Sequence, residues 1–327
     1  MQISNVEKQF INFIINIKNK LNKNRLSIGI LYSGGVDSTV LLHIANKYKN
    51  ELNLNITILH IVFDDIKDYK IIKKQVDLFS KWYENKLIIN YCSIKDLKSG
   101  IKENARNAMK EIALNLEYDI ILSGHHANDQ IETFLFRLFS RSSLEGLKGM
   151  DFLTNYKKNN KNILLGKPFL NIFKKDLYEY SYNNYLIFFE DETNLIDSIS
   201  NRNYIRNNII PIIENRFKLN NILNTIELIR ENIDTQKRKI TNIDIYNGKW
   251  NINDFINLPI GNRVFIIREY FSKVHGYNLN KAKINELKNR LEGDLFNLHI
   301  NIGNKFIIVF ENKYIICKYL KLVTESL

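Results

Sequence analysis

The first half of the chain alternates between two hydrophobic patterns. Continuous apolar runs, which are typical of buried parallel strands, lie at residues 26–31, 56–62, 87–91 and 119–122. Apolar residues recur at helical spacing in the segments around them, at 6–17, 39–44, 69–83, 103–116 and 129–139. This alternation predicts an α/β fold, a parallel sheet with helices on both faces. Ligands of such sheets bind at the carboxyl ends of the strands.

The second half is organised differently. From Arg202 the pattern is mainly helical, with Pro211 as a break and helices expected at 221–240, 259–270 and 281–291. Two apolar runs, 298–302 and 306–317, predict a terminal strand pair. A chain of 327 residues is long enough for two hydrophobic cores. We therefore expect a first domain at 1–214 and a smaller, mainly helical domain at 215–327.

The turn after the first strand, called the 33–38 turn below, reads Ser33-Gly34-Gly35-Val36-Asp37-Ser38. A strand, a glycine-rich turn and a helix form a phosphate-binding corner, because the helix N-terminus offers free N–H groups and the glycines allow close approach. Ser33 and Ser38 add hydroxyl donors. A carboxylate beside phosphates needs a cation between them, so Asp37 is interpreted as a Mg²⁺ ligand. The alternative is an ordinary turn in which Asp37 or Ser38 caps the helix.

A second polar string follows the strand at 119–122. It reads Ser123-Gly124-His125-His126-Ala127-Asn128-Asp129-Gln130-Ile131-Glu132-Thr133. Asp129 and Glu132 have the spacing of a capping box, which is the structural alternative. The same spacing places both carboxylates on one side of the first helical turn, where strand ends converge. With Asp37 they are candidate ligands for Mg²⁺ beside ATP phosphates.

Charge and composition narrow the class of partner. The formal charge is +12 and the pI is about 9.4, values typical of proteins that bind a polyanion such as nucleic acid. Charge alone does not separate this interpretation from a solvated basic surface without a partner. No apolar run approaches the roughly 18 residues of a membrane span, and the first helix lacks a secretion leader. Cys92 and Cys317 lie far apart in apolar runs, so neither a zinc site nor a disulfide is expected. We expect a cytoplasmic protein with no membrane partner.

Both strings resemble known families. The 33–38 turn resembles the PP-loop of the ATP pyrophosphatases, and the second string resembles the Gly-His-His-x-Asp-Asp-Gln-x-Glu-Thr signature of the tRNA(Ile)-lysidine synthetases. The match continues over ordered segments along the chain: Glu103 with Ala105-Arg106, Gly146-Leu147, Gly149-Met150, Lys167-Pro168-Phe169-Leu170, Asp191-Glu192-Thr193-Asn194 and Arg202-Asn203-Tyr204-Ile205-Arg206. The resemblance is strong from about residue 26 to 214 and weak beyond.

The resemblance implies a fold, a reaction and a set of site residues. A PP-loop domain at 1–214 would form an adenylate from ATP, with Mg²⁺, on the wobble cytidine of an isoleucine tRNA with a CAU anticodon. The ε-amine of free L-lysine would then displace AMP to give lysidine, and the domain at 215–327 would bind tRNA. The implied nucleotide-binding residues are Ser33, Gly34, Gly35, Val36, Asp37, Ser38, Gly124 and His125. The implied catalytic residues are Asp37, Asp129, Glu132, Arg106, Arg202 and Arg206, of which Asp37, Asp129 and Glu132 would hold the metal.

Each of these side chains also has a structural interpretation. Arg202 and Arg206 fit a solvated basic helix face, and Arg106 fits a surface ion pair with Glu103. His125 and His126 fit capping or packing as well as nucleotide contact. The basic tract at 237–239 is interpreted as a solvated helix end.

The chain departs from the family pattern at three places. Asn128 replaces the first Asp of the usual Asp-Asp pair, the family's Arg-Gly-Ser-Gly turn reads Ser140-Arg141-Ser142-Ser143, and the usual His-rich turn reads Phe63-Asp64-Asp65. Two other functions therefore stay open. A PP-loop tRNA thiolase would need cysteine pairs that the two cysteines do not provide, and a non-catalytic RNA-binding relative would not need the acidic residues that are retained.

Overall fold

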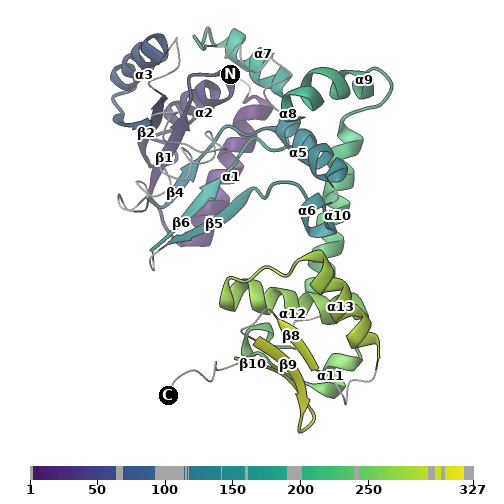
Figure 1. The fold of residues 1–327 in the computed structure, drawn as a ribbon. Helices are drawn as coiled ribbons and strands as arrows, with labels where there is room; N and C mark the ends of the chain where they lie inside the picture. Colours follow the sequence, from purple (N-terminus) through teal and green to yellow (C-terminus); the bar gives the residue numbers. More distant parts are fainter. Residues whose placement is uncertain are drawn as a thin grey trace. The chain divides into compact units, whose positions relative to one another are not determined.

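The apolar runs of the first half assemble into one six-stranded sheet of order β3-β2-β1-β4-β6-β5 (Figure 1). Neighbouring strands are parallel except β5, which pairs antiparallel with β6 at one edge. The strands are β1 (Leu26–Tyr32), β2 (Leu54–Phe63), β3 (Lys86–Cys92), β4 (Ile120–Leu122), β5 (Leu153–Lys158) and β6 (Lys161–Gly166). The computed structural model describes residues 3–63, 69–92, 114, 116, 118–140, 142–158, 161–189, 201–238, 243–293, 299–302 and 306–319.

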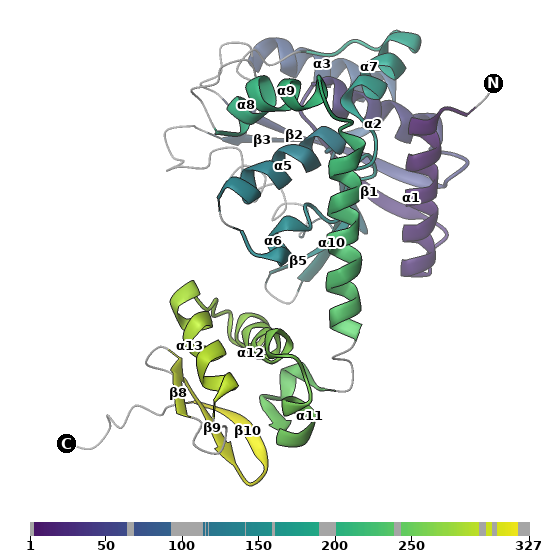
Figure 2. The ribbon, with the colours of Figure 1, turned by 90° about the vertical axis from the view of Figure 1, so that its right-hand side faces the viewer.

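The main hydrophobic core joins this sheet to α1 (Asn5–Leu21), α2 (Val36–Lys47), α3 (Tyr69–Trp82) and α7 (Lys174–Asn183), which are seen from a second direction in Figure 2. The chain also forms α5 (Ala127–Phe139), α6 (Leu144–Leu147), α8 (Asn201–Tyr204), α9 (Ile210–Glu214) and α10 (Asn220–Arg238), with a π-helical segment, Ile205–Ile209, between α8 and α9. No helix in the described part of the chain combines the length and the apolar character that crossing a bilayer requires.

The helix α1 shows why this packing follows from the sequence. Phe10 and Ile14, four residues apart, are fully buried in the main core. Ser4 and Glu7 cap the first turn reciprocally. Glu7 is itself buried, and it accepts hydrogen bonds from Lys47 Nζ at 2.6 Å and from the Tyr180 hydroxyl at 2.9 Å. A buried carboxylate requires such partners, so Glu7 ties α1 to α2 and α7.

The chain divides into two compact units, Met1–Arg230 and Glu231–Leu327. The predicted boundary was at residue 214, whereas the first unit continues to Arg230, within α10. Leu219 and Ile226 are the reason, because they pack with Ile131 and Ile210 in one hydrophobic cluster of the first unit. Apolar burial, and not the proline break, therefore sets the end of the unit.

The second unit contains a four-stranded antiparallel sheet of order β7-β10-β9-β8, of which the expected terminal strands form part. Its strands are β7 (Lys249–Asn251), β8 (His299–Ile302), β9 (Phe306–Glu311) and β10 (Tyr314–Tyr319). Its helices are α11 (Ile252–Ile256), α12 (Ile260–His275) and α13 (Lys281–Glu292), with a 3₁₀ turn, Ile245–Asn247. The predicted turn after Glu311 is present, and Asn312 and Lys313 both have positive φ, as a tight hairpin requires.

The core of this second unit is aromatic. Trp250 stacks on Phe255 at 5.9 Å and meets Tyr270 edge-on at 5.6 Å. Beside this core, Arg263 donates from its guanidinium to three backbone carbonyls, those of Ile256, Leu258 and Leu291. These carbonyls lie near the ends of α11 and α13, where helical partners are lacking. Arg263 therefore joins α11, α12 and α13.

Most predicted elements are confirmed. The four predicted strands are present, with ends that differ by at most two residues, while α2 and α5 begin earlier than expected, at Val36 and Ala127. The helix expected at 103–116 lies almost entirely outside the described residues. The hairpin β5–β6 and the helix α7 were not predicted, because β5 is a polar edge strand and α7 buries few side chains, namely Leu177, Tyr180 and Ser181.

We predict that Arg263→Met destabilises the second unit by about 2 kcal/mol, because carbonyls that the guanidinium satisfied lose their partner. Arg268→Met on the same helix is the control, with the same charge change and an expected effect below about 0.5 kcal/mol. Urea unfolding can be followed by Trp250, which is 2% exposed, in a Trp82→Phe background, since Trp82 is 73% exposed and the chain has two tryptophans. Equal midpoints for both variants would contradict the assigned role of Arg263.

Candidate functional site

The 33–38 turn leads from β1 into α2 with an uncapped helix start. Gly34 has φ +88°, a conformation that side chains disfavour, and Gly35 is the N-cap residue without a side-chain cap bond. The Ser38 hydroxyl donates to the Gly35 carbonyl at 3.0 Å, and it accepts from the Ser33 N–H at 3.2 Å. Neither Asp37 nor Ser38 is the N-cap, so the ordinary-turn alternative does not describe this corner. The first N–H groups of α2 are left to meet an anion.

Gln75 on α3 holds the turn from outside, a role that the sequence did not indicate. Its side-chain amide donates to the Tyr32 hydroxyl and to the Ile187 carbonyl, both at 3.0 Å, and it lies 3.4 Å from the Gly34 carbonyl. The Phe189 N–H also donates to the Gly34 carbonyl, at 2.8 Å. Segment 186–189 is thus fastened to the turn. Gln75 and Ile187 are 112 positions apart in the sequence, so no pattern of neighbouring residues indicates this contact.

The loop between β4 and α5 lies directly against the 33–38 turn. A Cβ on Gly124 would come within 2.8 Å of the Asp37 carbonyl carbon and 2.9 Å of its oxygen. Real side chains do not approach backbone this closely, so only glycine permits the contact. The two polar strings identified in the sequence therefore converge on one place at the carboxyl ends of β1 and β4.

His126 lies between two carboxylates at this junction. Its Nε2 is 3.6 Å from Asp37 Oδ1 and 3.7 Å from Asp129 Oδ2, and the same Asp129 oxygen accepts the His126 backbone N–H at 2.9 Å. Burial alone would lower the pKa of His126, but the carboxylates of Asp129 and Asp37 raise it above its usual value. Burial alone would raise the pKa of Asp129, but His126 and its neighbours lower it.

One carboxylate oxygen at the junction lacks a hydrogen bond. Asp37 Oδ1 is buried and has no hydrogen-bond partner within the described residues. An orphaned anionic oxygen beside an uncapped helix start is what a cation-binding position requires. In the described residues, this junction included, no group of three or more His, Cys, Asp or Glu side chains is arranged to hold a metal ion, so phosphate oxygens would have to complete the coordination.

Glu132 differs from the expectation that it binds metal with Asp37 and Asp129. Arg206 Nε donates to one Glu132 oxygen at 2.6 Å and Arg206 Nη2 to the other at 2.8 Å. Glu132 is 3% exposed, so this bidentate pair takes both of its oxygens in a buried position. The bond to Glu132 raises the pKa of Arg206. Arg206 lies in the π-helical segment, a backbone feature often found at functional sites.

The remaining site residues have separate places. The guanidinium of Arg202 lies over the Phe136 ring at 5.6 Å, and His125 Nδ1 is 2.8 Å from the Ser123 hydroxyl. Asn128 Oδ1 accepts the Lys174 backbone N–H at 3.0 Å, so this residue caps the start of α7. Arg106, Glu103 and the segment 191–194 lie outside the described residues.

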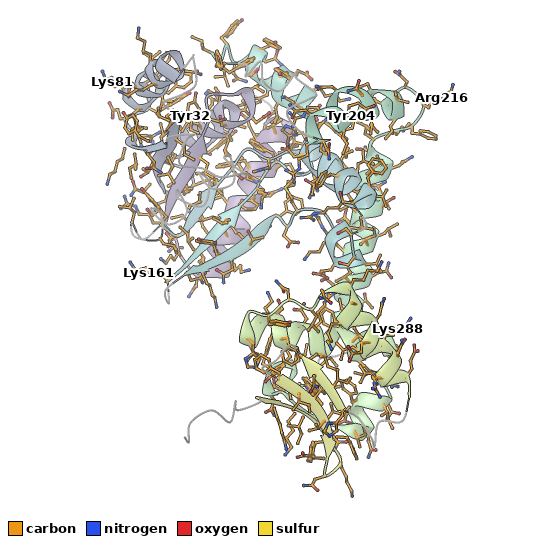
Figure 3. The ribbon with its side chains drawn as sticks, viewed as in Figure 1. Tyr32, Lys81, Lys161, Tyr204, Arg216 and Lys288 are labelled. Atoms are coloured by element: carbon orange, nitrogen blue, oxygen red, sulfur yellow. The ribbon has the colours of Figure 1, made fainter. Side chains whose placement is uncertain are left out.

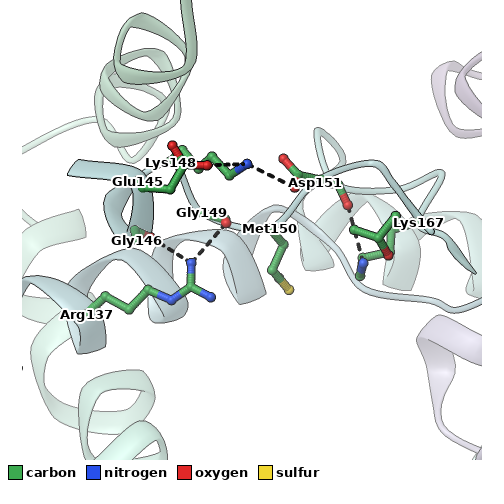
Figure 4. Close-up of a pocket in the computed structure, with 9 residues that line it drawn as sticks. Arg137, Glu145, Gly146, Lys148, Gly149, Met150, Asp151 and Lys167 are labelled. Carbon is green, nitrogen blue, oxygen red and sulfur yellow. Dashed lines mark hydrogen bonds and ion pairs between the residues drawn. The ribbon is translucent and has the colours of Figure 1, made fainter. Parts of the chain in front are cut away.

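A charged pocket of about 450 Å³ adjoins α5 and α6 (Figure 4). Lys148 bridges the carboxylates of Glu145 and Asp151 at 3.1 and 3.2 Å, and Arg137 donates to the carbonyls of Gly146 and Gly149. Gln130 exchanges two hydrogen bonds with the Met150 backbone. These polar groups brace the segment that carries the family's Gly-Leu and Gly-Met pairs.

The PP-loop domain family matches residues 3–213, nearly two thirds of the chain. The chain belongs to the PP-loop family. The 33–38 turn, which resembles the PP-loop and is called the PP-loop below, lies within the matched residues. The match ends beside the predicted domain boundary, ahead of the end of the first compact unit.

Several curated relatives share one name. Proteins called tRNA(Ile)-lysidine synthase are similar to this chain in Borrelia garinii subsp. bavariensis (34% identity over 62% of this chain and 45% of that protein) and Buchnera aphidicola subsp. Schizaphis graminum (34%, 70% and 52%). Another, from Buchnera aphidicola subsp. Baizongia pistaciae, is 29% identical over 80% of this chain and 61% of its own length. The chain spans about half the length of these curated relatives.

Solved structures with a similar fold include a tRNA thiolase. The U34-tRNA thiolase NcsA from Methanococcus maripaludis, solved with its [4Fe-4S] cluster, aligns with a TM-score of 0.53 over 69% of this chain and 80% of that chain. The sequence identity is 15%, so this likeness supports the PP-loop fold and carries no argument about chemistry.

We predict that Gly124→Ala weakens ATP binding by about 2 kcal/mol, roughly thirtyfold, because the added methyl group pushes the PP-loop away from α5. Gly261→Ala is the control, since a Cβ there meets nothing within 4 Å. Calorimetric titration with ATP measures both, after circular dichroism has verified folding. Unchanged ATP binding by a folded Gly124→Ala protein would refute the close approach.

The raised pKa of His126 gives a second prediction. Protonated His126 stabilises the fold below the unfolded pKa of 6.5, and this contribution is lost as pH rises through the higher folded pKa. Asp129→Asn removes the larger of the two raising charges, so the pKa of His126 should fall. Histidine NMR titration of both proteins measures this, and an unaltered His126 titration would rule out the coupling.

Proposed function

We propose that this PP-loop protein is a tRNA(Ile)-lysidine synthetase. The observation that carries the proposal is the junction of the PP-loop with the start of α5, where Asp37, His126 and Asp129 meet in the segment that bears the lysidine-synthetase signature. The curated relatives of that name support it. The substrates would be ATP, free L-lysine and an isoleucine tRNA with a CAU anticodon.

ATP would lie with its phosphates at the PP-loop. The uncapped N-terminus of α2 and the Ser33 hydroxyl would supply donors for phosphate oxygens, whereas the Ser38 hydroxyl already donates its proton to the Gly35 carbonyl. The orphaned Asp37 oxygen and the Asp129 carboxylate fit a Mg²⁺ ion, which commonly binds one or two carboxylates together with substrate phosphates. When bound, Mg²⁺ would neutralise phosphate charge. Glu132 is not counted among its ligands, because Arg206 holds both of its oxygens.

The reaction needs two displacements. The C2 oxygen of cytidine would attack the α-phosphorus and release diphosphate, and the lysine ε-amine would then attack C2, lose a proton and release AMP. Arg206 can stabilise the negative charge that develops at the α-phosphate, because Glu132 fixes its guanidinium and keeps it charged. A nearby carboxylate would accept the amine proton. The lowered pKa of Asp129 keeps it ionised but makes it a weak proton acceptor, so it suits metal binding better than this step.

The cysteines argue against thiolation. The chain has two cysteines, and Cys317 lies in β10 of the second unit, where burial raises the pKa of its thiol. A thiol of raised pKa is a poor sulfur carrier at neutral pH.

We further propose that the second unit contributes to tRNA binding. Its described surface carries exposed cations, among them Lys288 on α13, which extends outward in Figure 3. Phosphate contacts from such side chains would make tRNA affinity fall with salt.

The decisive experiment supplies isotopically labelled lysine, ATP and unmodified tRNA, and analyses the digested nucleosides by mass spectrometry. The proposal predicts labelled lysidine, with AMP and diphosphate as co-products. Sulfur-containing nucleoside in a sulfur-supplemented reaction would favour the thiolase, and ADP as the main nucleotide product would refute the adenylate mechanism.

Asn128 allows a sharper comparison within the site. We predict that Asp129→Asn lowers the rate of lysidine formation roughly a hundredfold, because charge beside the phosphates is lost. Asn128→Asp should change the rate little, since its side-chain oxygen faces the backbone of α7 and an aspartate can accept the same bond. Both rates are measured at saturating Mg²⁺ with circular dichroism as the folding control. An active Asp129→Asn protein together with a faster Asn128→Asp protein would reverse the assignment.

A further inference from the structure

A row of aromatic side chains lies on one face of α7 and has no part in the reaction described above. Lys174, Tyr178 and Tyr182 follow one another at four-residue spacing, which places them on the same helical face. The Tyr178 and Tyr182 rings are stacked, with centroids 6.2 Å apart and planes at 18°. Phe188 adds a third ring, 5.8 Å from Tyr178 and 6.2 Å from Tyr182. We call these four residues the α7 ladder.

Two rings of the α7 ladder are packed against the core and the third is exposed to solvent. Tyr178 and Phe188 pack against the main hydrophobic core, so their rings have fixed positions. Tyr182 is 65% exposed although it is stacked. When a planar ligand stacks on a ring that is already immobilised, the protein loses little additional conformational entropy.

The ladder begins at the active centre. The backbone N–H of Lys174 is bonded to Asn128, the neighbour of Asp129, and the charge of Lys174 opposes protonation of His126. Its Nζ lies 5.5 Å from the centre of the Tyr178 ring. At the other side, segment 186–189 is bonded to the PP-loop at Gly34. The row of rings therefore starts beside the site where the target base must lie.

We propose that the α7 ladder is a stacking surface for unpaired RNA nucleotides that flank the modified base. Flat rings interleaved with a cation are the features by which proteins hold single-stranded RNA, since bases stack on the rings and the cation meets a phosphate. The net charge of the chain is +12, so a polyanion such as RNA is a better partner for this patch than the surface of another protein. This inference rests on the proposed function, because it takes the partner to be the anticodon loop.

The test measures binding of a hairpin RNA with the anticodon-arm sequence of the CAU-containing isoleucine tRNA. Tyr182→Ala should weaken binding about tenfold through loss of base stacking, with an unchanged salt dependence. Tyr182→Phe keeps the ring and should bind like the original protein. Lys174→Gln should lower the slope of affinity against salt by about one. ATP affinity and thermal unfolding serve as folding controls.

Tyr185→Ala is the matched control. Tyr185 is 93% exposed and follows α7 directly, yet it belongs to none of the ring contacts of the ladder. Equal hairpin affinities for Tyr182→Ala, Tyr185→Ala and the original protein would overturn the inference. Light scattering gives a second contradicting outcome. If Tyr182→Ala changes the molecular mass in solution without loss of RNA affinity, the patch binds another copy of the chain and not RNA.

The outcome separates this inference from the proposed function. If the original protein forms lysidine while Tyr182→Ala binds the hairpin equally well, only the ladder is wrong. If the original protein neither binds the hairpin nor modifies tRNA, both fail.

Discussion

The contact between Gly124 and the backbone of Asp37 is the constraint on which the site depends. Two loops that follow adjacent parallel strands can touch only because residue 124 has no side chain. That approach brings Asp37 to His126, and it places the first turn of α5 beside the PP-loop. Asp129 lies on that first turn and Glu132 on the next, so their positions follow from the same contact.

The charges at this junction are balanced in pairs. His126 lies between Asp37 and Asp129, and Arg206 holds Glu132. Two carboxylates so close together would repel each other without a cation between them. The imidazole of His126, whose pKa the two carboxylates raise, would supply that charge when it is protonated, and a nucleotide-bound metal would supply it during catalysis. Glu132, by contrast, accepts hydrogen bonds from Arg206 through both of its oxygens.

Local patterns were sufficient to predict the parallel strands β1 to β4 and the two loops, because apolar runs and glycine-rich turns are properties of neighbouring residues, but they did not reveal the polar hairpin β5–β6. Partners across the fold were not predictable. Nothing near Gln75 indicates that its amide fastens the PP-loop, and nothing near Arg263 indicates three carbonyl acceptors. Glu132 was expected to bind metal because its spacing from Asp129 is visible, whereas Arg206 is 74 positions away. The end of the first unit was missed because Leu219 and Ile226 join a cluster built by α5.

Crystals of the protein with a non-hydrolysable ATP analogue and Mn²⁺ would test the arrangement of charges most directly, since Mn²⁺ is located by its anomalous scattering. The account predicts Mn²⁺ bound by Asp37 and Asp129 together with phosphate oxygens, while Arg206 keeps both of its bonds to Glu132. Mn²⁺ coordinated by Glu132, with Arg206 released, would contradict it.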